Sequence, residues 1–376
     1  MRSDRVWLDL TELVANPLQT GIQRLERELI RHWPNPGQLS PCRYDADAGR
    51  FVSIPDEVFG VLGSRGERGN LSTAEQRARI RPLLADAPPV EFRRHEILFN
   101  PEVFFDKGRA QHYEALSAGG GVGISWILYD FVVYLRPQDY QQGAVRGCMH
   151  YLKAIRSVDR IAFISEKTRL DYARIIRRDV DAVVVPLGAD GLGLGRQTFD
   201  PTHRGYVCIG TIEPRKNVAL LLDVFGAYWN SGGQSTLTLA GRLDSRAVRE
   251  AEMLAALAEE RRLRVLGPVS DATMREVLGG VRATFYLSEF EGFGIPPIES
   301  LHAGVPVVVH HATPSIAALP AGGQIRLDGV SADSVSASLK RLEDDVEASR
   351  LWAEAAELSL PTWQDVVQRI GSWVTR

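Results

Sequence analysis

The 376-residue sequence is poor in cysteine, with only Cys42, Cys148 and Cys208. Three scattered cysteines are too few for a disulfide framework or a cysteine-rich metal cluster, which indicates buried thiols in a reducing compartment. No run approaches the roughly 18 consecutive apolar residues that a membrane-spanning helix needs. Met-Arg-Ser-Asp passes directly into an apolar run, so we expect no signal peptide and a cytoplasmic location.

The sequence also lacks an excess of one charge. Its 44 Lys and Arg residues against 47 Asp and Glu residues give a net charge of −3. Such a balance provides no global attraction to nucleic acid. A content of 44% hydrophobic and 24% charged residues is typical of globular proteins, and 376 residues exceed what one core usually organises, which predicts two domains.

Short runs rich in Val, Ile and Leu alternate with segments of helical periodicity along most of the chain. Strands of this kind are typical of parallel sheets that are buried on both faces. The predicted fold class is therefore α/β, with two doubly wound, Rossmann-like domains. The expected strands are 6–13, 123–130, 160–165, 182–188, 206–211, 235–241, 264–269, 283–288 and 305–310, and the expected helices include 22–33, 141–156, 166–177, 216–230, 245–261 and 271–280.

Composition suggests where the domains begin and end. The first domain is expected over 1–188, a glycine-rich linker over 189–204 and the second domain over 205–358, with a tail over 359–376. Residues 60–95 are rich in Gly, Arg and Pro. They are interpreted as an insertion or mobile loop that carries one short helix over 73–84.

The loop IGTIEPRKN, residues 209–217, follows the first strand of the second domain. Doubly wound sheets bind ligands outside the carboxyl ends of their strands. Arg215 and Lys216 stand near a predicted helix start at Pro214, where backbone N–H groups and two cations would bind a phosphate or diphosphate. Two solvated surface cations are the alternative interpretation.

The stretch SEFEGFGIPPIES, residues 288–300, places Glu291 and Glu299 eight positions apart. We expect Glu291 in a loop and Glu299 in the first turn of a helix, so that both face one cleft. Carboxylates suit sugar and ribose hydroxyls because they accept hydrogen bonds from them. The alternative is a capping box from Ser288 to Glu291, which would leave the two neighbouring glycines unexplained.

The stretch LYDFVVYLRP, residues 128–137, ends the corresponding strand of the first domain. Asp130 could accept a proton or orient a hydroxyl, and Tyr129 could hydrogen-bond a ligand. A core tyrosine and a turn aspartate are the alternative. The acid pairs at 45–47 and 179–181 and the pair at 310–311 lack the context of a metal site, so no metal is expected.

Taken together, these motifs resemble the retaining glycosyltransferases of the GT-B fold, family 4, also called glycosyltransferase group 1. GTIEPRKN (210–217) resembles the phosphate-binding segment of that family, and EGFGIPPIE (291–299) matches its EX7E motif. TGIQRLERELIR (20–31) resembles the glycine turn and helix that open the acceptor domain. The tail resembles the family's C-terminal helix, which crosses back to the N-terminal domain.

The resemblance implies two domains that face a central cleft, and it assigns roles to individual residues. Arg215 and Lys216 would hold the donor diphosphate, and Glu291 would contact hydroxyls of the transferred sugar. Glu299 would bind the ribose. Tyr129 and Asp130 would contact the acceptor or the sugar. Further donor contacts are implied for Gly21, Thr211, Val269, Phe293, Gly294 and Ile295.

Two positions depart from the family pattern. Thr211 stands where members often carry an arginine, so one diphosphate cation is missing. Tyr129 and Asp130 stand where the family often has His-Asp, and a tyrosine can replace a hydrogen bond but not a titratable imidazole.

The resemblance implies a retaining, metal-independent hexosyltransferase without a cofactor, resembling bacterial mannosyl- and rhamnosyltransferases of surface polysaccharide assembly. The expected partners are a nucleotide sugar, GDP-mannose before other GDP-, UDP- or dTDP-sugars, and a glycan or lipid-linked glycan acceptor. Peripheral association with the inner face of the membrane stays open. A sugar-nucleotide epimerase, a glycan phosphorylase and a non-catalytic partner subunit of the same fold are the alternatives.

Overall fold

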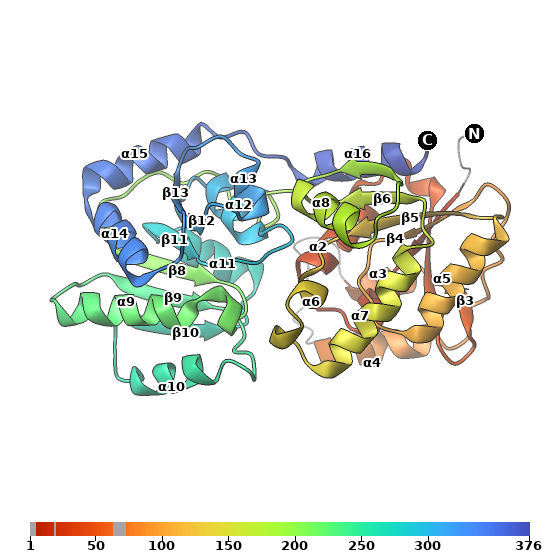
Figure 1. Ribbon diagram of the computed structural model, residues 1–376, viewed down its shortest axis with the longest axis horizontal. Helices are drawn as coiled ribbons and strands as arrows, with labels where there is room; N and C mark the ends of the chain where they lie inside the picture. The colour runs from red at the N-terminus through yellow and green to blue at the C-terminus, as the bar shows by residue number, and fades with distance from the viewer. Residues whose placement is uncertain (1–4, 19, 63–72) are drawn as a thin grey trace. The chain divides into compact units, whose positions relative to one another are not determined.

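The structure, a computed structural model, describes residues 5–18, 20–62 and 73–376. The chain divides into two compact units, called unit 1 (Met1–Leu187 with Trp363–Arg376) and unit 2 (Gly188–Thr362). Each unit contains one sheet, made largely of parallel strands, with helices packed around it (Figure 1). The predicted α/β class is therefore confirmed.

Seven strands form the sheet of unit 1, in the order β3-β2-β1-β4-β5-β6-β7. All neighbouring pairs are parallel except β2 with β3, which are antiparallel and joined by a turn at residues 46–49. The expected strands did not include this antiparallel edge, where half-exposed strands lack the continuous apolar runs of buried ones. The strands are β1 (Val6–Asp9), β2 (Leu39–Asp45), β3 (Arg50–Ser53), β4 (Ile97–Asn100), β5 (Gly123–Leu128), β6 (Arg160–Phe163) and β7 (Asp181–Val184).

Unit 1 contains the helices expected over 22–33, 73–84, 141–156 and 166–177, with ends that differ by two residues at most. The C-terminal helix α16 belongs to this unit and packs against α2, and a Cβ on Gly371 would lie 2.6 Å from Cδ of Pro34, just after α2. Residues 63–72 of the expected insertion lie outside the described residues. The helices are α1 (Thr11–Ala15), α2 (Gly21–His32), α3 (Glu57–Leu62), α4 (Thr73–Leu83), α5 (Lys107–Gly119), α6 (Val132–Leu135), α7 (Gln142–Ile155), α8 (Glu166–Ile175) and α16 (Trp363–Val374), with 3-10 turns η1 (Pro36–Gln38) and η2 (Pro137–Asp139).

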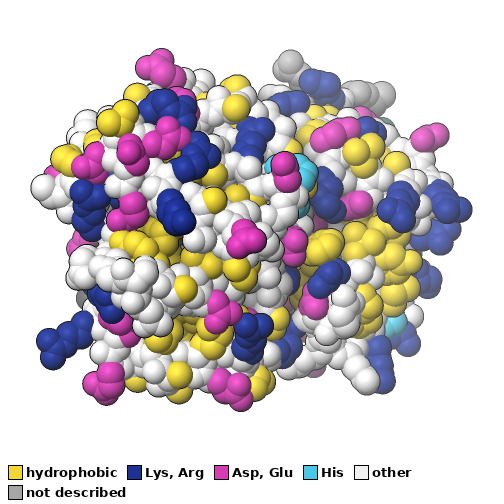
Figure 2. Space-filling view, turned by 60° about the vertical axis from the view of Figure 1, so that its left-hand side comes forward, with side chains coloured by type: hydrophobic (Ala, Val, Ile, Leu, Met, Phe, Trp, Pro, Cys, Tyr) yellow, Lys and Arg dark blue, Asp and Glu magenta, His cyan; other side chains and the backbone are white. Residues whose placement is uncertain are grey.

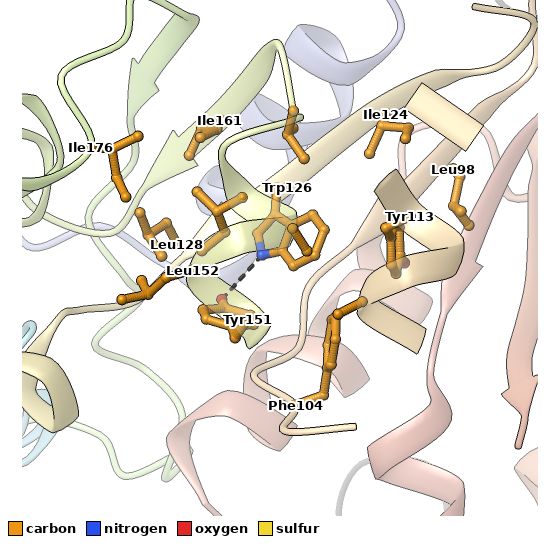
Figure 3. Close-up of a cluster of buried hydrophobic side chains, with 14 of the residues drawn as sticks. Leu98, Phe104, Tyr113, Ile124, Trp126, Leu128, Tyr151, Leu152, Ile161 and Ile176 are labelled. Atoms are coloured by element: carbon orange, nitrogen blue, oxygen red, sulfur yellow. Dashed lines mark hydrogen bonds between the residues drawn. The ribbon is translucent and has the colours of Figure 1, made fainter. Parts of the chain in front are cut away.

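Aromatic side chains fill the core of unit 1 between the sheet and helices α5 and α7 (Figure 3). Trp126 of β5 is fully buried and donates from Nε1 to the hydroxyl of Tyr151 at 3.0 Å. Phe104 and Tyr113 pack beside it, with ring centroids 5.7 and 4.8 Å from that of Trp126. Because the one polar atom of the indole is paired, this large side chain is buried without an unsatisfied donor.

Six parallel strands form the sheet of unit 2, in the order β10-β9-β8-β11-β12-β13. In chain order this is 3-2-1-4-5-6, the arrangement of dinucleotide-binding folds. The central strands are continuous apolar runs, as expected of strands that helices cover on both faces. The strands are β8 (Gly205–Ile209), β9 (Thr236–Ala240), β10 (Leu263–Gly267), β11 (Ala283–Tyr286), β12 (Val307–His310) and β13 (Gln324–Leu327).

Residues 189–204, expected as a linker, contain no helix or strand and lie within unit 2. Leu192 is buried, and the amide of Gln197 donates to the carbonyl of Ala303 at 2.8 Å. The helices of unit 2 are η3 (Pro214–Lys216, a 3-10 turn), α9 (Val218–Asn230), α10 (Val248–Ala256), α11 (Asp271–Leu278), α12 (Ile295–His302), α13 (Pro314–Ala317), α14 (Ala332–Glu343) and α15 (Asp345–Ala356).

Two further properties of the described residues concern the apolar character of the helices and the charges on the surface. None of their helices combines the length and the apolar character needed to cross a bilayer. On the face presented in Figure 2, Lys and Arg side chains are interspersed with Asp and Glu. The small net charge thus arises from mixed signs.

Candidate functional site

The central strands of the unit 2 sheet, β8 and β11, are parallel neighbours whose carboxyl ends lie at the same edge. The strand order reverses between them, and doubly wound sheets bind ligands at this point. The loops that follow are residues 210–217 and 287–294. We call these two loops the switch-point site.

The first loop turns sharply at Gly210, whose φ of 124° favours glycine. A Cβ there would lie 2.8 Å from Nζ of Lys216, so the small residue also makes room for the lysine. Pro214–Lys216 form a 3-10 turn, and the α-helix begins only at Val218. The expected α-helix start at residue 214 is therefore wrong, and both cations of the loop precede the helix.

Arg215 and Lys216 converge on Glu291 of the second loop. Nη1 of Arg215 donates to Oε1 of Glu291 at 2.9 Å and to the carbonyl of Phe290 at 2.8 Å. Nζ of Lys216 lies 3.9 Å from the same carboxylate oxygen. Each of the three charged side chains is 14% exposed. The structure thus brings three predicted site residues together and leaves them partly accessible.

Glu291 is ionised at neutral pH. Burial raises the pKa of its carboxyl, but Lys216, Arg215 and hydrogen bonds from the Ser288 and Tyr286 hydroxyls outweigh that effect, so the pKa lies below its ordinary value. Burial and the Glu291 carboxylate raise the pKa of Tyr286 well above its ordinary value. Glu291 is consequently suited to accept hydrogen bonds from ligand hydroxyls and not to donate a proton.

Helix α12 leaves the second loop at Ile295. Gly294 precedes it with a φ of 94°, and the Gly294 carbonyl accepts a hydrogen bond from Oγ of Ser315 at 2.7 Å. Ser288 lies seven residues before this helix, so the capping-box interpretation of Ser288 and Glu291 is wrong. The glycine has a backbone role instead, because an ordinary residue would be strained at that φ.

The remaining predicted residues of unit 2 lie on or near the same edge. Glu299 is the fifth residue of α12, so it lies in the second turn and not in the first, and it is 8% exposed. Phe293 is buried in the second loop. Thr211 is half-buried after β8, and Val269 is half-buried between β10 and α11, two strands away.

The predicted residues of unit 1 are engaged within that unit. Gly21 is the first residue of α2. The hydroxyl of Tyr129 donates to the carbonyl of Pro101 at 2.6 Å, and burial raises its pKa well above the ordinary value. Oδ1 of Asp130 accepts from the amide of Val132 at the start of α6. These contacts fit the alternative of a core tyrosine and a turn aspartate.

Sequence inspection missed Glu213, which completes the switch-point site. Its Oε1 lies 2.7 Å from Nη2 of Arg215, and its Oε2 lies 3.6 Å from Nη2 of Arg246. The guanidinium of Arg215 is therefore held between two carboxylates, Glu213 and Glu291. The available signal was an acid two residues before the arginine within GTIEPRKN.

Sequence inspection also missed a buried charge cluster in unit 1. Nη2 of Arg109 lies 2.6 Å from both Oδ2 of Asp9 and Oε2 of Glu102, and all three side chains are fully buried. Burial raises the pKa of Glu102 to about 8. Glu26 of α2 is also fully buried, and within the described residues its carboxylate oxygens have no hydrogen-bond partner.

Neither the switch-point site nor the buried charge cluster of unit 1 forms a metal-binding group of described residues. In the part of the chain that the structure describes, no three His, Cys, Asp or Glu side chains are arranged to hold a metal ion. The acid pairs noted in the sequence lie elsewhere: residues 45–47 begin the β2–β3 turn, and residues 179–181 lead into β7.

Comparison with known families and proteins gives consistent results. Residues 196–359 match the family model described as glycosyl transferases group 1. The O-antigen chain mannosyltransferase B of Escherichia coli is 27% identical over 252 residues, which cover 61% of this chain and 65% of that protein. The serotype-specific mannosyltransferase WbdA of E. coli is 22% identical over 331 residues, 81% of this chain and 37% of WbdA. The chain therefore spans about two thirds of one relative and just over a third of the other.

Solved structures agree on the fold. Anabaena Alr3699/HepE, crystallised with UDP and glucose, superposes with a TM-score of 0.67 at 14% identity, covering 98% of both chains. At this identity the likeness concerns architecture alone, which is the GT-B fold. Residues 196–359 match a family that this fold carries, and the switch-point site lies within them.

Proposed function

Residues 196–359 form a glycosyltransferase group 1 domain, and from this premise we propose that the chain transfers a hexose from a nucleoside-diphosphate sugar to a glycan acceptor. The observation that carries the proposal is the convergence of Arg215 and Lys216 on Glu291 at the carboxyl edge between β8 and β11. Cations placed beside an ionised acceptor of hydrogen bonds suit a ligand with a diphosphate and a sugar at opposite ends.

The chemistry follows from where charge develops. When the bond between the anomeric carbon and the diphosphate oxygen breaks, its electron pair stays on the phosphate and the sugar ring becomes cationic. Lys216, with donors left over after its 3.9 Å contact, would stabilise the departing phosphate as a fixed charge. Glu291 would hold the sugar hydroxyls, and Arg215, bound to Glu291 and Glu213, would fix that carboxylate in place.

Retention of configuration fits this set of groups. The acceptor hydroxyl attacks the anomeric carbon on the face that the diphosphate leaves, and its proton passes to the departing phosphate oxygen. No separate base is then required, and Glu291 acts as a hydrogen-bond acceptor and not as a nucleophile. We assign no metal to the reaction, because Lys216 supplies positive charge beside the leaving group.

The proposed donor is GDP-mannose and the proposed acceptor is a glycan or lipid-linked glycan of bacterial polysaccharide assembly, met at the inner face of the membrane. Support for mannose comes from the relatives named as mannosyltransferases, at 27% and 22% identity. Ribose would contact Glu299, and Val269 would lie near the base. Other GDP-, UDP- and dTDP-sugars are the competing donors.

The decisive experiment is a thermal-shift screen with GDP-, UDP-, dTDP- and ADP-linked sugars, because only a ligand that binds the folded state raises Tm. The donor that shifts Tm is then tested for transfer in EDTA, and NMR of the product reports the anomeric configuration. Lys216→Ala should abolish most of the transfer, and Lys340→Ala, an exposed lysine on α14, is the matched control.

Three results would contradict the proposal. The first is a Tm that no nucleotide sugar changes, together with no transfer, which would favour a non-catalytic partner subunit. The second is conversion of the nucleotide sugar to an epimer without an acceptor. The third is transfer that Lys216→Ala leaves unchanged. Strict dependence on Mn²⁺ or Mg²⁺ would contradict the metal-free mechanism alone.

A further inference from the structure

Residues 131–180 of unit 1 are basic although the chain as a whole is acidic. This segment contains ten Lys and Arg residues against five Asp and Glu residues, a net charge of +5, whereas the whole chain has −3. It includes helices α6, α7 and α8, which lie in unit 1 in Figure 1. The remainder of the chain therefore has a net charge of −8.

Six of these ten cations are paired with acids nearby. Four arginines have no acidic partner within the described residues, and three of the four line one hollow; the fourth, Arg146, donates to Oε1 of Gln142. Within the described residues, Arg156, Arg174 and Arg177 have no acidic partner, and Nε of Arg177 donates only to the carbonyl of Arg174. All three are exposed. The pairs that neutralise other cations of the segment are Arg136–Asp139, Lys153–Glu114, Arg160–Asp181, Lys167–Asp171, Arg169–Glu166 and Arg178–Asp159.

The three arginines line one open hollow of about 540 Å³, whose other walls are Tyr134, Leu135, Ile175 and Ile176. We call this feature the arginine hollow. Arg156 is the C-cap of α7, Arg174 lies in the last turn of α8, and Arg177 follows the end of α8 by two residues. Three like charges brought to one place repel each other, so an anion bound among them would be favoured.

Apolar side chains are exposed at and near the arginine hollow. Tyr134 is 43% exposed and Leu135 is 39% exposed, both on α6 at the wall of the hollow. Met149 on α7 and Leu170 on α8 are 52% and 55% exposed. Exposed aromatic and aliphatic groups interleaved with arginines are suited to a ligand that carries a charge and an apolar body together.

We propose that the arginine hollow binds the phosphate headgroups of anionic phospholipids and docks the chain on a membrane surface. Arginine forks match phosphate oxygens, and Tyr134 and Leu135 would reach the boundary between headgroups and acyl chains. A small soluble phosphate is a poorer match, because its sites usually enclose the anion with backbone N–H groups. The proposal is independent of the donor site, since vesicle binding requires neither donor nor acceptor.

The test is co-sedimentation of the full chain with phosphatidylcholine vesicles that contain about 30 mol% phosphatidylglycerol, compared with pure phosphatidylcholine. Combined Arg156→Ala, Arg174→Ala and Arg177→Ala should lower the partition coefficient roughly 100-fold, about fivefold for each basic side chain. Combined Arg50→Ala, Arg79→Ala and Arg81→Ala removes the same net charge from exposed positions of unit 1 and should have a much smaller effect. Tyr134→Ser with Leu135→Ser should weaken binding roughly 10-fold.

Three outcomes would overturn the proposal. One is equal binding of the unmodified chain to neutral and anionic vesicles. Another is an equal loss in the two triple variants, which would mean that net charge and not the hollow attracts the membrane. The last is release from vesicles by millimolar inorganic phosphate that also raises Tm in the unmodified chain alone, which would identify a soluble-phosphate site. Unchanged Tm values of the variants without ligand check that all of them fold.

Discussion

Each of the two sheets contains a point at which the strand order reverses, and the charged side chains at the two points differ in burial. In unit 1 the strand order reverses between β1 and β4, where Asp9 and Glu102 pair with Arg109 and all three are fully buried. In unit 2 it reverses between β8 and β11, where charged side chains keep 14% of their surface exposed. One reversal point is filled by the protein's own ion pairs, and the other keeps its charges within reach of a ligand.

The difference teaches that a charge cluster at the carboxyl edge of a sheet is not by itself a ligand site. Burial decides which function the cluster has. Ions removed from water must be compensated by partners inside the fold, so the cluster at Arg109 is structural. Partly exposed ions such as Lys216 can exchange water for a ligand. Four variants test this contrast.

Removing the buried cation should have the largest effect. Arg109→Ala leaves Asp9 and Glu102 buried without their partner, and it should reduce the free energy of unfolding by about 3–5 kcal/mol. Urea denaturation followed by fluorescence measures the loss. Arg169→Ala, which breaks an exposed pair with Glu166, is the control and should cost about 0–1 kcal/mol. Equal effects of the two variants would refute the structural role of the buried cluster.

Removing the partly exposed cation of unit 2 should affect catalysis much more than stability. Lys216→Ala should lower donor-dependent transfer by roughly 10²–10³-fold, as loss of one preorganised charge does in other enzymes. The free energy of unfolding should change by less than about 1 kcal/mol, because the 3.9 Å contact is partly solvated. Steady-state kinetics and urea denaturation on the same preparation separate the two effects. A loss of stability as large as that of Arg109→Ala would erase the contrast.

The buried carboxyl group of Glu26 in unit 1 should make the free energy of unfolding depend on pH. Burial and the neighbouring Glu102 raise the pKa of Glu26 well above its ordinary value, while Arg27 and Arg109 oppose the shift. The folded state thus favours the neutral acid, whose stabilising contribution is complete below about pH 4.5 and is lost as pH rises through the folded pKa. Glu26→Gln mimics the neutral acid at every pH. Its stability should match that of the unmodified chain near pH 4 and exceed it by up to about 1.4 kcal/mol per pH unit above pH 5.

Urea denaturation from pH 4 to pH 9 measures that difference. Glu28→Gln provides a control on the same helix, since the Glu28 carboxylate is paired with Arg31 and His32. A difference between Glu26→Gln and the unmodified chain that is independent of pH would show that the two states hold the Glu26 proton equally.

The smallest effect is expected at Glu213. Glu213→Gln keeps the shape of the side chain but weakens its 2.7 Å contact with Arg215, so Glu291 should be held less firmly. We expect kcat to fall about 10-fold with little change in the donor KM, because a positioning residue acts through another group. A double-mutant cycle with Arg215→Lys should reveal a coupling of roughly 0.5–3 kcal/mol. Additive effects would mean that Glu213 does not act through Arg215.

Much of the fold could be predicted from the sequence, for reasons that are local. Periodicity located α2, α7 and α8, and continuous apolar runs located β8, β9 and β11. The antiparallel β2–β3 edge and β4 escaped, because half-exposed or four-residue strands among polar, Arg-rich and Pro-rich residues give no clear pattern.

The candidate site was predictable in part. Two short motifs pointed to Arg215, Lys216 and Glu291, because the turn residues and the charged residues of each motif can be recognised directly in the sequence. The helix start at residue 214 and the placement of Glu299 in a first turn were wrong. A 3-10 turn and an α-helix share proline at their start, and only the hydrogen-bond pattern of the folded chain distinguishes them.

The sequence by itself determined the α/β alternation, the glycine turns and the presence of cations and acids in two loops. Only the tertiary structure decided which of them meet. Arg215 and Glu291 are 76 positions apart, and Arg109 and Asp9 are 100 positions apart. Strand order brings each pair together, and the surrounding packing sets how much water reaches it. Neither the strand order nor the access of water can be derived from local sequence. For this reason two similar sets of charges form a buried core element in unit 1 and a partly accessible site in unit 2.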